Sequence, residues 1–142
     1  MMKGIITEVQ GPVVDVLFPE GQLPFIKDAL TVQNGEQKCV MEVAQHMGDN
    51  IVRCIMLSPS EGLCREMEVT AEGGGIQVPV GDRTLGRLFN VTGEIIDGGE
   101  PLPEGEKWCI HRDPPGFADQ SPVVEILETG IKVIDLLAPY AK

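Results

Sequence analysis

Two histidines and four cysteines are the residues of this sequence whose chemistry could hold a metal ion. His46 and His111 stand 65 positions apart, and no cysteine lies within four residues of His46. Structural zinc sites use four ligands that come in short, closely spaced pairs. Cys109 and His111 form one near pair, but the sequence offers no second pair. We therefore predict no metal site, and histidines that lie at the surface or in an interface.

The cysteine spacing also argues against a disulfide framework. Cys39, Cys54, Cys64 and Cys109 include no Cys-x-x-Cys pair. The N-terminal stretch MMKGIITEVQ has one lysine and no apolar run long enough for a signal peptide. Reduced, mostly buried thiols in a cytosolic protein are the expected state. No stretch approaches 18 apolar residues, so direct insertion into a membrane is not expected.

Catalytic chemistry has few candidate groups. The carboxylate pairs Glu94/Asp97 and Glu125/Glu128 have the spacing of an acid–base dyad, but solvated charges on a hairpin and a helix explain them more simply. The glycine cluster at 73–75 is not followed by Lys-Ser or Lys-Thr, and a phosphate cradle needs that lysine. We predict no catalytic residue, no cofactor-binding residue and no metal ligand within residues 1–142.

Two arginines remain as candidates for an interface, Arg87 and Arg112. The formal net charge of −11 would repel a phosphate backbone, which disfavours nucleic acid as a partner. A hydrophobic content of 42% in 142 residues suffices for one packed domain and part of another.

The first half of the chain is predicted to consist of strands. Short alternating segments are separated by turn residues every 8–12 positions, which favours a small antiparallel barrel or sandwich over βαβ units. Asn34-Gly35 is the strongest hairpin signal, and it should pair DALTVQ with CVMEVAQ so that Cys39, Met41 and Val43 share one face. The six expected strands are 4–10, 13–18, 28–33, 39–45, 51–57 and 65–69.

The second half is predicted to hold connectors and one helix. IQVPVG at 76–81 should be a strand that leaves the first domain, and a short helix or turn and a hairpin around Thr92-Gly93 should follow. Residues 100–107 should form a loop and 108–117 an extended stretch, because a residue before proline avoids the helical region.

The final helix should begin near Thr129 as its N-cap and end at Pro139. Ile131, Ile134 and Leu137 fall on one face at a spacing of three. A helix this short is marginal alone in water. It must pack back on its own chain or on a sheet that these 142 residues do not supply.

Several phrases in this order resemble one family over essentially the whole chain, from Gly4 to Lys142. They are QGPVVDVLFP, DALTVQNG, VPVGDRTLGRLFNVTGEIID, the IHR of 110–112, and ETGIKVIDLLAPYAK. The chain is similar to the N-terminal part of the beta, or catalytic, subunit of the rotary proton-translocating ATP synthase. The sister alpha subunit shares VPVG, LGR and TGIK but usually lacks DALTVQNG and IHR, so beta is favoured over alpha.

The resemblance implies a mainly β fold in two parts. Residues 1–78 would form a six-stranded antiparallel β-barrel, the crown domain. Residues 79–142 would begin an α/β P-loop nucleotide-binding domain, and the final helix would pack against its central sheet. The phosphate loop would follow soon after Lys142, so no nucleotide-binding or catalytic residue of the family maps onto this sequence.

The resemblance also implies a function and partners. The intact subunit would make ATP from ADP and phosphate, driven by a transmembrane proton gradient, with Mg-ATP or Mg-ADP bound between subunits. Its partners would be alpha subunits in an alternating hexamer and the central gamma subunit, peripheral to the cytoplasmic face of the membrane. Met1-Met2 adds almost no extension ahead of the matching phrases, which favours a bacterial source. The alternatives are a stand-alone barrel that binds a partner and a non-catalytic alpha-type fragment.

Overall fold

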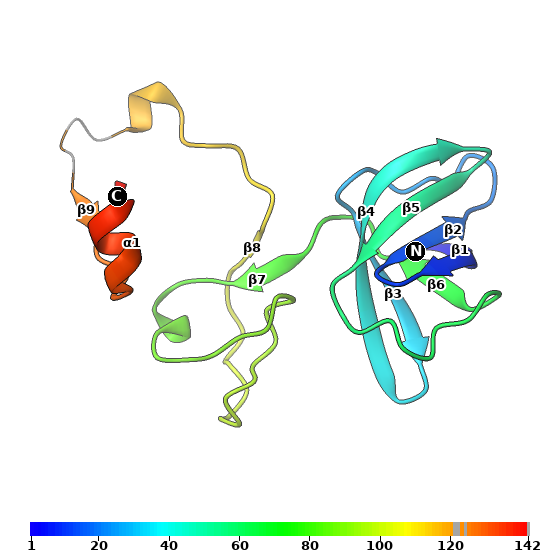
Figure 1. Cartoon of the computed structure of the whole chain (residues 1–142), viewed down its shortest axis with the longest axis horizontal. Coiled ribbons are helices and arrows are strands. Elements are labelled where there is room, and N and C mark those ends of the chain that lie inside the picture. Colours follow the sequence, from blue (N-terminus) through cyan, green and yellow to red (C-terminus); the bar gives the residue numbers. More distant parts are fainter. Residues whose placement is uncertain (121–122, 124, 142) are drawn as a thin grey trace. The chain divides into compact units, whose positions relative to one another are not determined.

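The computed structural model describes residues 1–120, 123 and 125–141. The chain divides into two compact units, Met1–Arg112 and Asp113–Lys142. The first unit holds a β-barrel and a two-stranded ribbon that follows it in the sequence (Figure 1). None of the helices in the described residues is long and apolar enough to cross a membrane. The predicted boundary between residues 78 and 79 stays a prediction, because the ribbon belongs to the same compact unit as the barrel.

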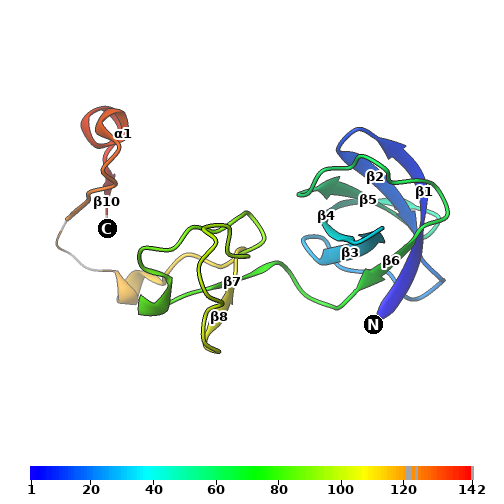
Figure 2. The same ribbon diagram turned by 90° about the horizontal axis from the view of Figure 1, so that it is seen from below.

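Six antiparallel strands close into a barrel in the order β1-β2-β5-β4-β3-β6, which Figure 2 shows as a ring. The strand pattern of the sequence was consistent with a barrel or a sandwich, and the closed strand order shows that the fold is a barrel. Closure pairs β1 with β6 and leaves no free edge strand in this sheet. The strands are β1 (Met2–Gln10), β2 (Val13–Leu17), β3 (Ala29–Asn34), β4 (Gln37–Gly48), β5 (Ile51–Met56) and β6 (Glu68–Ala71).

The barrel interior is filled by alternate residues of the strands. Cys39, Met41 and Val43 of β4 point inward and are fully buried, as the alternation predicted. Gly4 of β1 faces the same interior, where an added Cβ would lie 2.8 Å from Cγ1 of Val16. The other core residues are Ile6, Val14, Val16, Phe18, Leu30, Val32, Val52, Cys54, Met56, Leu63, Val69 and Ala71.

Two details of the barrel differ from the prediction. The β3–β4 hairpin turns on Gly35 and Glu36, and Asn34 is the last residue of β3, paired with Gln37. Gly35 has φ = 62°, as the first position of a tight hairpin turn requires. The sixth strand begins at Glu68 rather than at residue 65, because Glu66 adopts φ = 71° and the chain turns there.

The residues after the barrel form a ribbon and a loop. β7 (Gln77–Pro79) pairs antiparallel with β8 (Lys107–Cys109), and a 3-10 turn, η1, covers Asp82–Thr84. The predicted strand at 76–81 is present but shorter, and the predicted short helix or turn is confirmed. The predicted hairpin around Thr92-Gly93 reduces to a single bridge between Phe89 and Ile95.

The second unit contains short elements only: η2 (Phe117–Asp119), β9 (Ile126–Leu127), α1 (Lys132–Leu137) and β10 (Tyr140–Ala141), which pairs with β9. The expected helix start was wrong. The Thr129 N–H and hydroxyl both donate to Oδ1 of Asp135, at 3.0 and 2.6 Å, and the Gly130 N–H donates to Oδ2 at 3.1 Å. These bonds hold residues 129 and 130 in a loop, so Ile131 occupies the cap position without a side-chain bond. The helix ends at Leu137, ahead of Pro139 as predicted.

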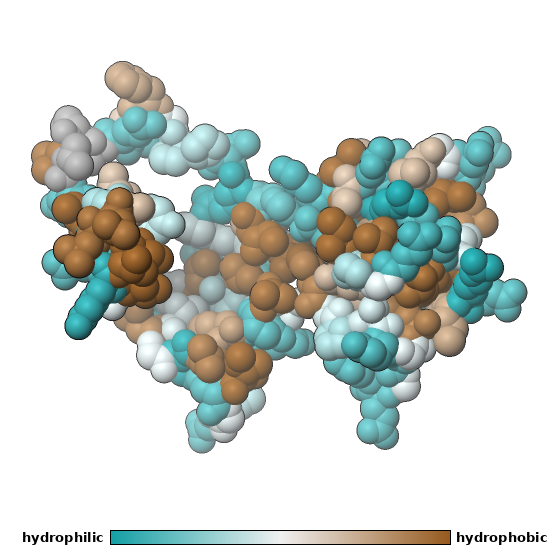
Figure 3. All heavy atoms as spheres, in the orientation of Figure 1, coloured by the Kyte–Doolittle hydropathy of each residue, from teal (hydrophilic) through white to brown (hydrophobic). Residues whose placement is uncertain are grey.

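The apolar stripe of α1 is open to solvent. Leu136 and Leu137 are each 80% exposed, and no residue of the helix is buried. Figure 3 shows the apolar side chains that gather over this helix. The first alternative, packing of the helix back on its own chain, is therefore not seen among the described residues.

Candidate functional site

The structure does not bring the two histidines together. Nε2 of His46 lies 2.8 Å from the carbonyl oxygen of Pro24, and Nε2 of His111 lies 2.7 Å from Oε2 of Glu42. Among the described residues there is no cluster of three or more side chains that could hold a metal. Each histidine instead contacts one oxygen of a neighbouring segment.

The cysteines are all free thiols, and they are not all buried. Cys39 and Cys54 lie in the barrel core, Cys109 is half-buried and Cys64 is exposed. Burial raises the pKa of the Cys54 thiol to about 12, and the nearby Asp15 carboxylate adds to the shift. The expectation of mostly buried thiols holds for the two in the barrel.

The predicted carboxylate pairs do not form an acid–base dyad among the described side chains. Oε2 of Glu94 accepts a bond from Asn90 at 2.8 Å, whereas Asp97 is bound by Arg87. Glu125 and Glu128 lie exposed on either side of β9. The pairs are therefore close in sequence without sharing a site.

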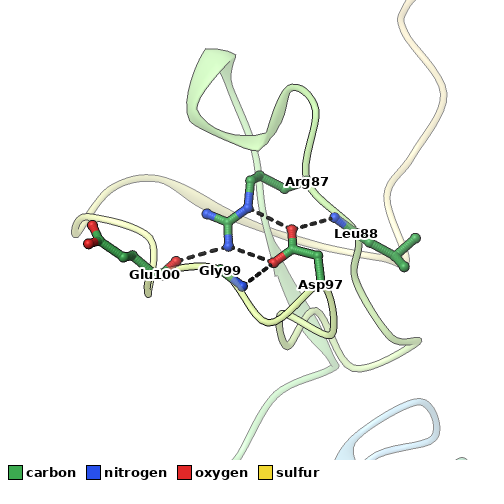
Figure 4. Close-up of polar contacts among 5 residues, drawn as sticks. All are labelled: Arg87, Leu88, Asp97, Gly99 and Glu100. Carbon is green, nitrogen blue, oxygen red and sulfur yellow. Dashed lines mark hydrogen bonds and ion pairs between the residues drawn. The ribbon is translucent and has the colours of Figure 1, made fainter.

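Arg87 and Asp97 form the most highly connected polar group of the loop that follows η1 (Figure 4). The guanidinium donates from Nε and Nη2 to the carboxylate, at 2.7 and 3.0 Å, and Nη2 also donates to the Glu100 carbonyl at 2.9 Å. The N–H groups of Leu88 and Gly99 also donate to the Asp97 carboxylate, at 3.1 and 2.8 Å. The two bonds from Arg87 and the two backbone bonds hold the pKa of Asp97 well below its usual range. Arg87, a candidate for an interface, thus bonds within its own loop.

An open hollow of about 980 Å³ lies beside the ribbon, lined in part by Arg83, Glu94 and Lys107. The Arg83 guanidinium donates to the carbonyl oxygens of Val80, Pro103 and Glu106. Because carbonyls occupy it, this guanidinium is not presented to an anionic ligand.

Strands β1, β2 and β5 carry an unusual set of side chains on the outside of the barrel. We call this set the outer face, and it consists of Ile5, Leu17, Ile51, Asp15, Arg53 and Ile55. Ile5 pairs with Leu17, and Leu17 pairs with Ile51, so one aliphatic row crosses three strands. Outward positions of a small barrel are usually polar, yet Ile5, Leu17 and Ile55 are aliphatic and 41–49% exposed.

An ion pair lies directly beside this row. Asp15 and Arg53 are cross-strand partners, and Nε and Nη2 of Arg53 each donate to the carboxylate at 2.8 Å. The hydrogen bonds from Arg53 lower the pKa of Asp15, although burial acts in the opposite direction. Ile55 lies on the other side of the pair on β5. The face therefore combines an aliphatic row with an ion pair, and Glu8 of β1 lies opposite Asp15.

Sequence reasoning missed the outer face, although a signal was present. Strands with one buried face should alternate, but GIITEVQ has Ile5 beside Ile6 and VVDVLF has Val16, Leu17 and Phe18 in a row. In each run, one apolar residue must point outward.

Comparison with known families identifies the barrel. Residues 6–73 match the family described as ATP synthase alpha/beta family, beta-barrel domain. The matched range begins inside β1 and ends just after β6, so it coincides with the closed barrel. The match covers just under half of the chain, and it makes the barrel similar to the beta-barrel domain of ATP synthase alpha and beta subunits. The description covers alpha and beta subunits alike.

Proposed function

We propose that this chain is the N-terminal part of an ATP synthase beta subunit and that its barrel joins neighbouring subunits in the catalytic ring. In the intact complex the subunit makes ATP from ADP and phosphate, driven by a transmembrane proton gradient. Alpha subunits alternate with it, gamma occupies the centre, and the complex lies against the cytoplasmic face of a bacterial membrane. Residues 79–142 begin the nucleotide-binding P-loop domain.

The observation that carries the assembly role is the outer face of a barrel of this family. A partner that covers this row of half-exposed aliphatic side chains would remove apolar surface from water, which favours association. Arg53 and Asp15 bond to each other, but burying this pair carries a desolvation cost, so the gain in affinity must come from the aliphatic row. We propose that contacts between the outer faces of neighbouring barrels hold the ring of subunits together.

Two phrases support beta over alpha. DALTVQNG spans β3 and its turn, and IHR spans 110–112, where His111 contacts the barrel. Both phrases are usual in beta subunits and usually absent from alpha. The nucleotide itself, as Mg-ATP or Mg-ADP, would bind to residues beyond Lys142, so we expect this segment alone to bind no Mg-ADP at micromolar concentration.

Binding to isolated subunits tests the proposal. The purified chain should bind the alpha subunit of a bacterial ATP synthase in sedimentation experiments and should not bind the beta subunit. An alpha-type chain would show the reverse preference, and a stand-alone module would bind neither.

A matched pair of variants tests the surface. Leu17→Arg places a charge in the aliphatic row and should weaken binding to alpha at least about tenfold. Leu136→Arg, which alters a more exposed leucine of α1, should leave binding unchanged. Equal effects of the two substitutions would remove the outer face from the interface.

A further inference from the structure

The tip of the β3–β4 hairpin holds an asparagine that is followed directly by a glycine. The strand register pairs Asn34 with Gln37, so Gly35 lies just beyond the last pair of the ladder. Gly35 is exposed, and it has no side chain that could cover its own backbone nitrogen. This nitrogen and the carboxamide carbon of Asn34 are close neighbours along the chain, and a bond between them would close a cyclic imide. Solvent therefore reaches the position where such a ring would form.

The same carboxamide attaches the loop that follows β5 to the hairpin. Nδ2 of Asn34 donates to the Glu61 carbonyl at 2.8 Å, across 27 positions of the sequence. The carboxamide lies against Gly62, where an added Cβ would come within 3.1 Å of Nδ2 and 3.2 Å of Oδ1. The start of the loop is held separately, because the Ser58 hydroxyl accepts the Val40 N–H at 3.1 Å. Asn34 thus holds the loop at Glu61, while β4 holds it at Ser58.

The other two asparagines of the sequence have different surroundings. Asn50 is followed by an isoleucine and Asn90 by a valine, and the branched Cβ of these residues crowds the backbone nitrogen that would have to react. Oδ1 of Asn90 also accepts the N–H groups of Thr92 and Glu94, at 3.0 and 2.8 Å, which holds that carboxamide in place. Asn34 is therefore the asparagine whose following nitrogen is least hindered.

We propose that Asn34 is a site of spontaneous deamidation, and that its conversion releases the loop after β5 from the hairpin. The Gly35 nitrogen loses its proton and bonds to Cγ of Asn34, the Cγ–Nδ2 bond breaks, and Nδ2 takes up a proton and leaves as ammonia. Water then opens the cyclic imide on either side, which gives aspartate or isoaspartate. Both products carry a carboxylate, which accepts hydrogen bonds but donates none, so the bond to the Glu61 carbonyl is lost. This inference does not depend on the proposed function.

Mass spectrometry of the whole chain, kept folded for several weeks at mildly alkaline pH, tests the modification. Trypsin places each asparagine in a separate peptide: 28–38, 39–53 and 88–107. The first peptide should gain the mass of an amide-to-acid change and separate into aspartate and isoaspartate forms, and its fragment ions should place the change at residue 34. The peptides with Asn50 and Asn90 are internal controls and should stay unmodified. An intact Asn34, or equal conversion of all the asparagines, would overturn the proposal.

A variant that carries the product tests the release of the loop. Asn34→Asp replaces the donor by a carboxylate at neutral pH. The hydrogen-exchange protection of the Leu63 amide, which donates to the Ser60 carbonyl within this loop, should fall about two- to tenfold, the size of one lost hydrogen bond. The Val43 amide of β4 is the reference and should not change. Asn50→Asp makes the same exchange elsewhere and should leave Leu63 protected. Unchanged protection of Leu63 in Asn34→Asp, or an equal fall in Asn50→Asp, would contradict the proposed release.

Discussion

The barrel and the segment that follows it within the same unit are built in opposite ways. The barrel holds fifteen buried residues in one apolar cluster inside a closed hydrogen-bond ladder. Residues 79–112 contain no buried residue, and their loop is shaped by side chains that bond to backbone groups. Arg83, Arg87, Asn90 and Asp97 supply most of those bonds.

The contrast teaches that one unit can take its stability from burial and its local shape from polar side chains. Burial of apolar surface does not depend on the charge of any one group. A carboxylate that organises a loop loses that role once it is protonated. The two regions should therefore respond to different perturbations, and matched substitutions can separate them.

The same substitution in the two kinds of environment should give the largest contrast. Leu30→Ala removes a fully buried side chain of β3 and should lower the free energy of unfolding by about 2–5 kcal/mol. Leu136→Ala, at a position that is 80% exposed, should change it by less than about 0.5 kcal/mol. Urea denaturation followed by circular dichroism measures both. Similar losses would mean that α1 has packing that its exposure does not show.

The junction between the regions should show the next largest effect. Gly75→Ala adds a Cβ that meets Sγ of Cys109 at 2.8 Å and should cost about 1–3 kcal/mol as the segments shift. Cys109→Ala in the same chain removes the nearer obstacle and should recover part of that loss, although the Lys27 carbonyl remains at 3.2 Å. A double-mutant cycle by urea denaturation measures the recovery, and strictly additive losses would show that the two residues do not meet.

The sequence predicted the barrel far better than the polar loop, and the reason is physical. Strand alternation is a local pattern, so Cys39, Met41 and Val43 could be assigned to one face before the structure was known. Glu66 could not be foreseen as a turn residue, because nothing local forces a glutamate to positive φ. Arg87 and Asp97 are ten positions apart in an irregular loop, and no periodic sequence pattern predicts a contact between them. His111 was noted in the sequence, but its contact with Glu42 comes from folding alone.

Acid should loosen the polar loop before it affects the barrel core. The pKa of Asp97 is lowered in the folded protein, so its carboxylate stabilises the loop above the ordinary carboxyl range, and this contribution is lost as the pH falls below about 4. The Leu88 and Gly99 amides, which donate to Asp97, should lose protection on acidification after correction for the intrinsic rates.

The control for this loss is a neutral isostere at the same position. Asp97→Asn should expose the same two amides already at pH 7, while the Leu57 amide of the barrel stays protected. If Leu88 and Gly99 remained protected in Asp97→Asn, the carboxylate would not be what shapes the loop.

The second unit should repeat this behaviour on a smaller scale. Asp135 accepts bonds from the N–H and hydroxyl of Thr129 and from the Gly130 N–H, and these bonds lower its pKa. It has no arginine fork, so Asp135→Asn should reduce the protection of the Thr129 and Gly130 amides by a smaller factor than Asp97→Asn causes in its loop. The sign with pH is the same, because a lowered pKa means that the stabilisation is present at neutral pH and fades with acid. Hydrogen exchange at pH 7 measures both variants in one experiment. A larger effect at Asp135 would show that the number of charged donors does not set the strength of these polar loops.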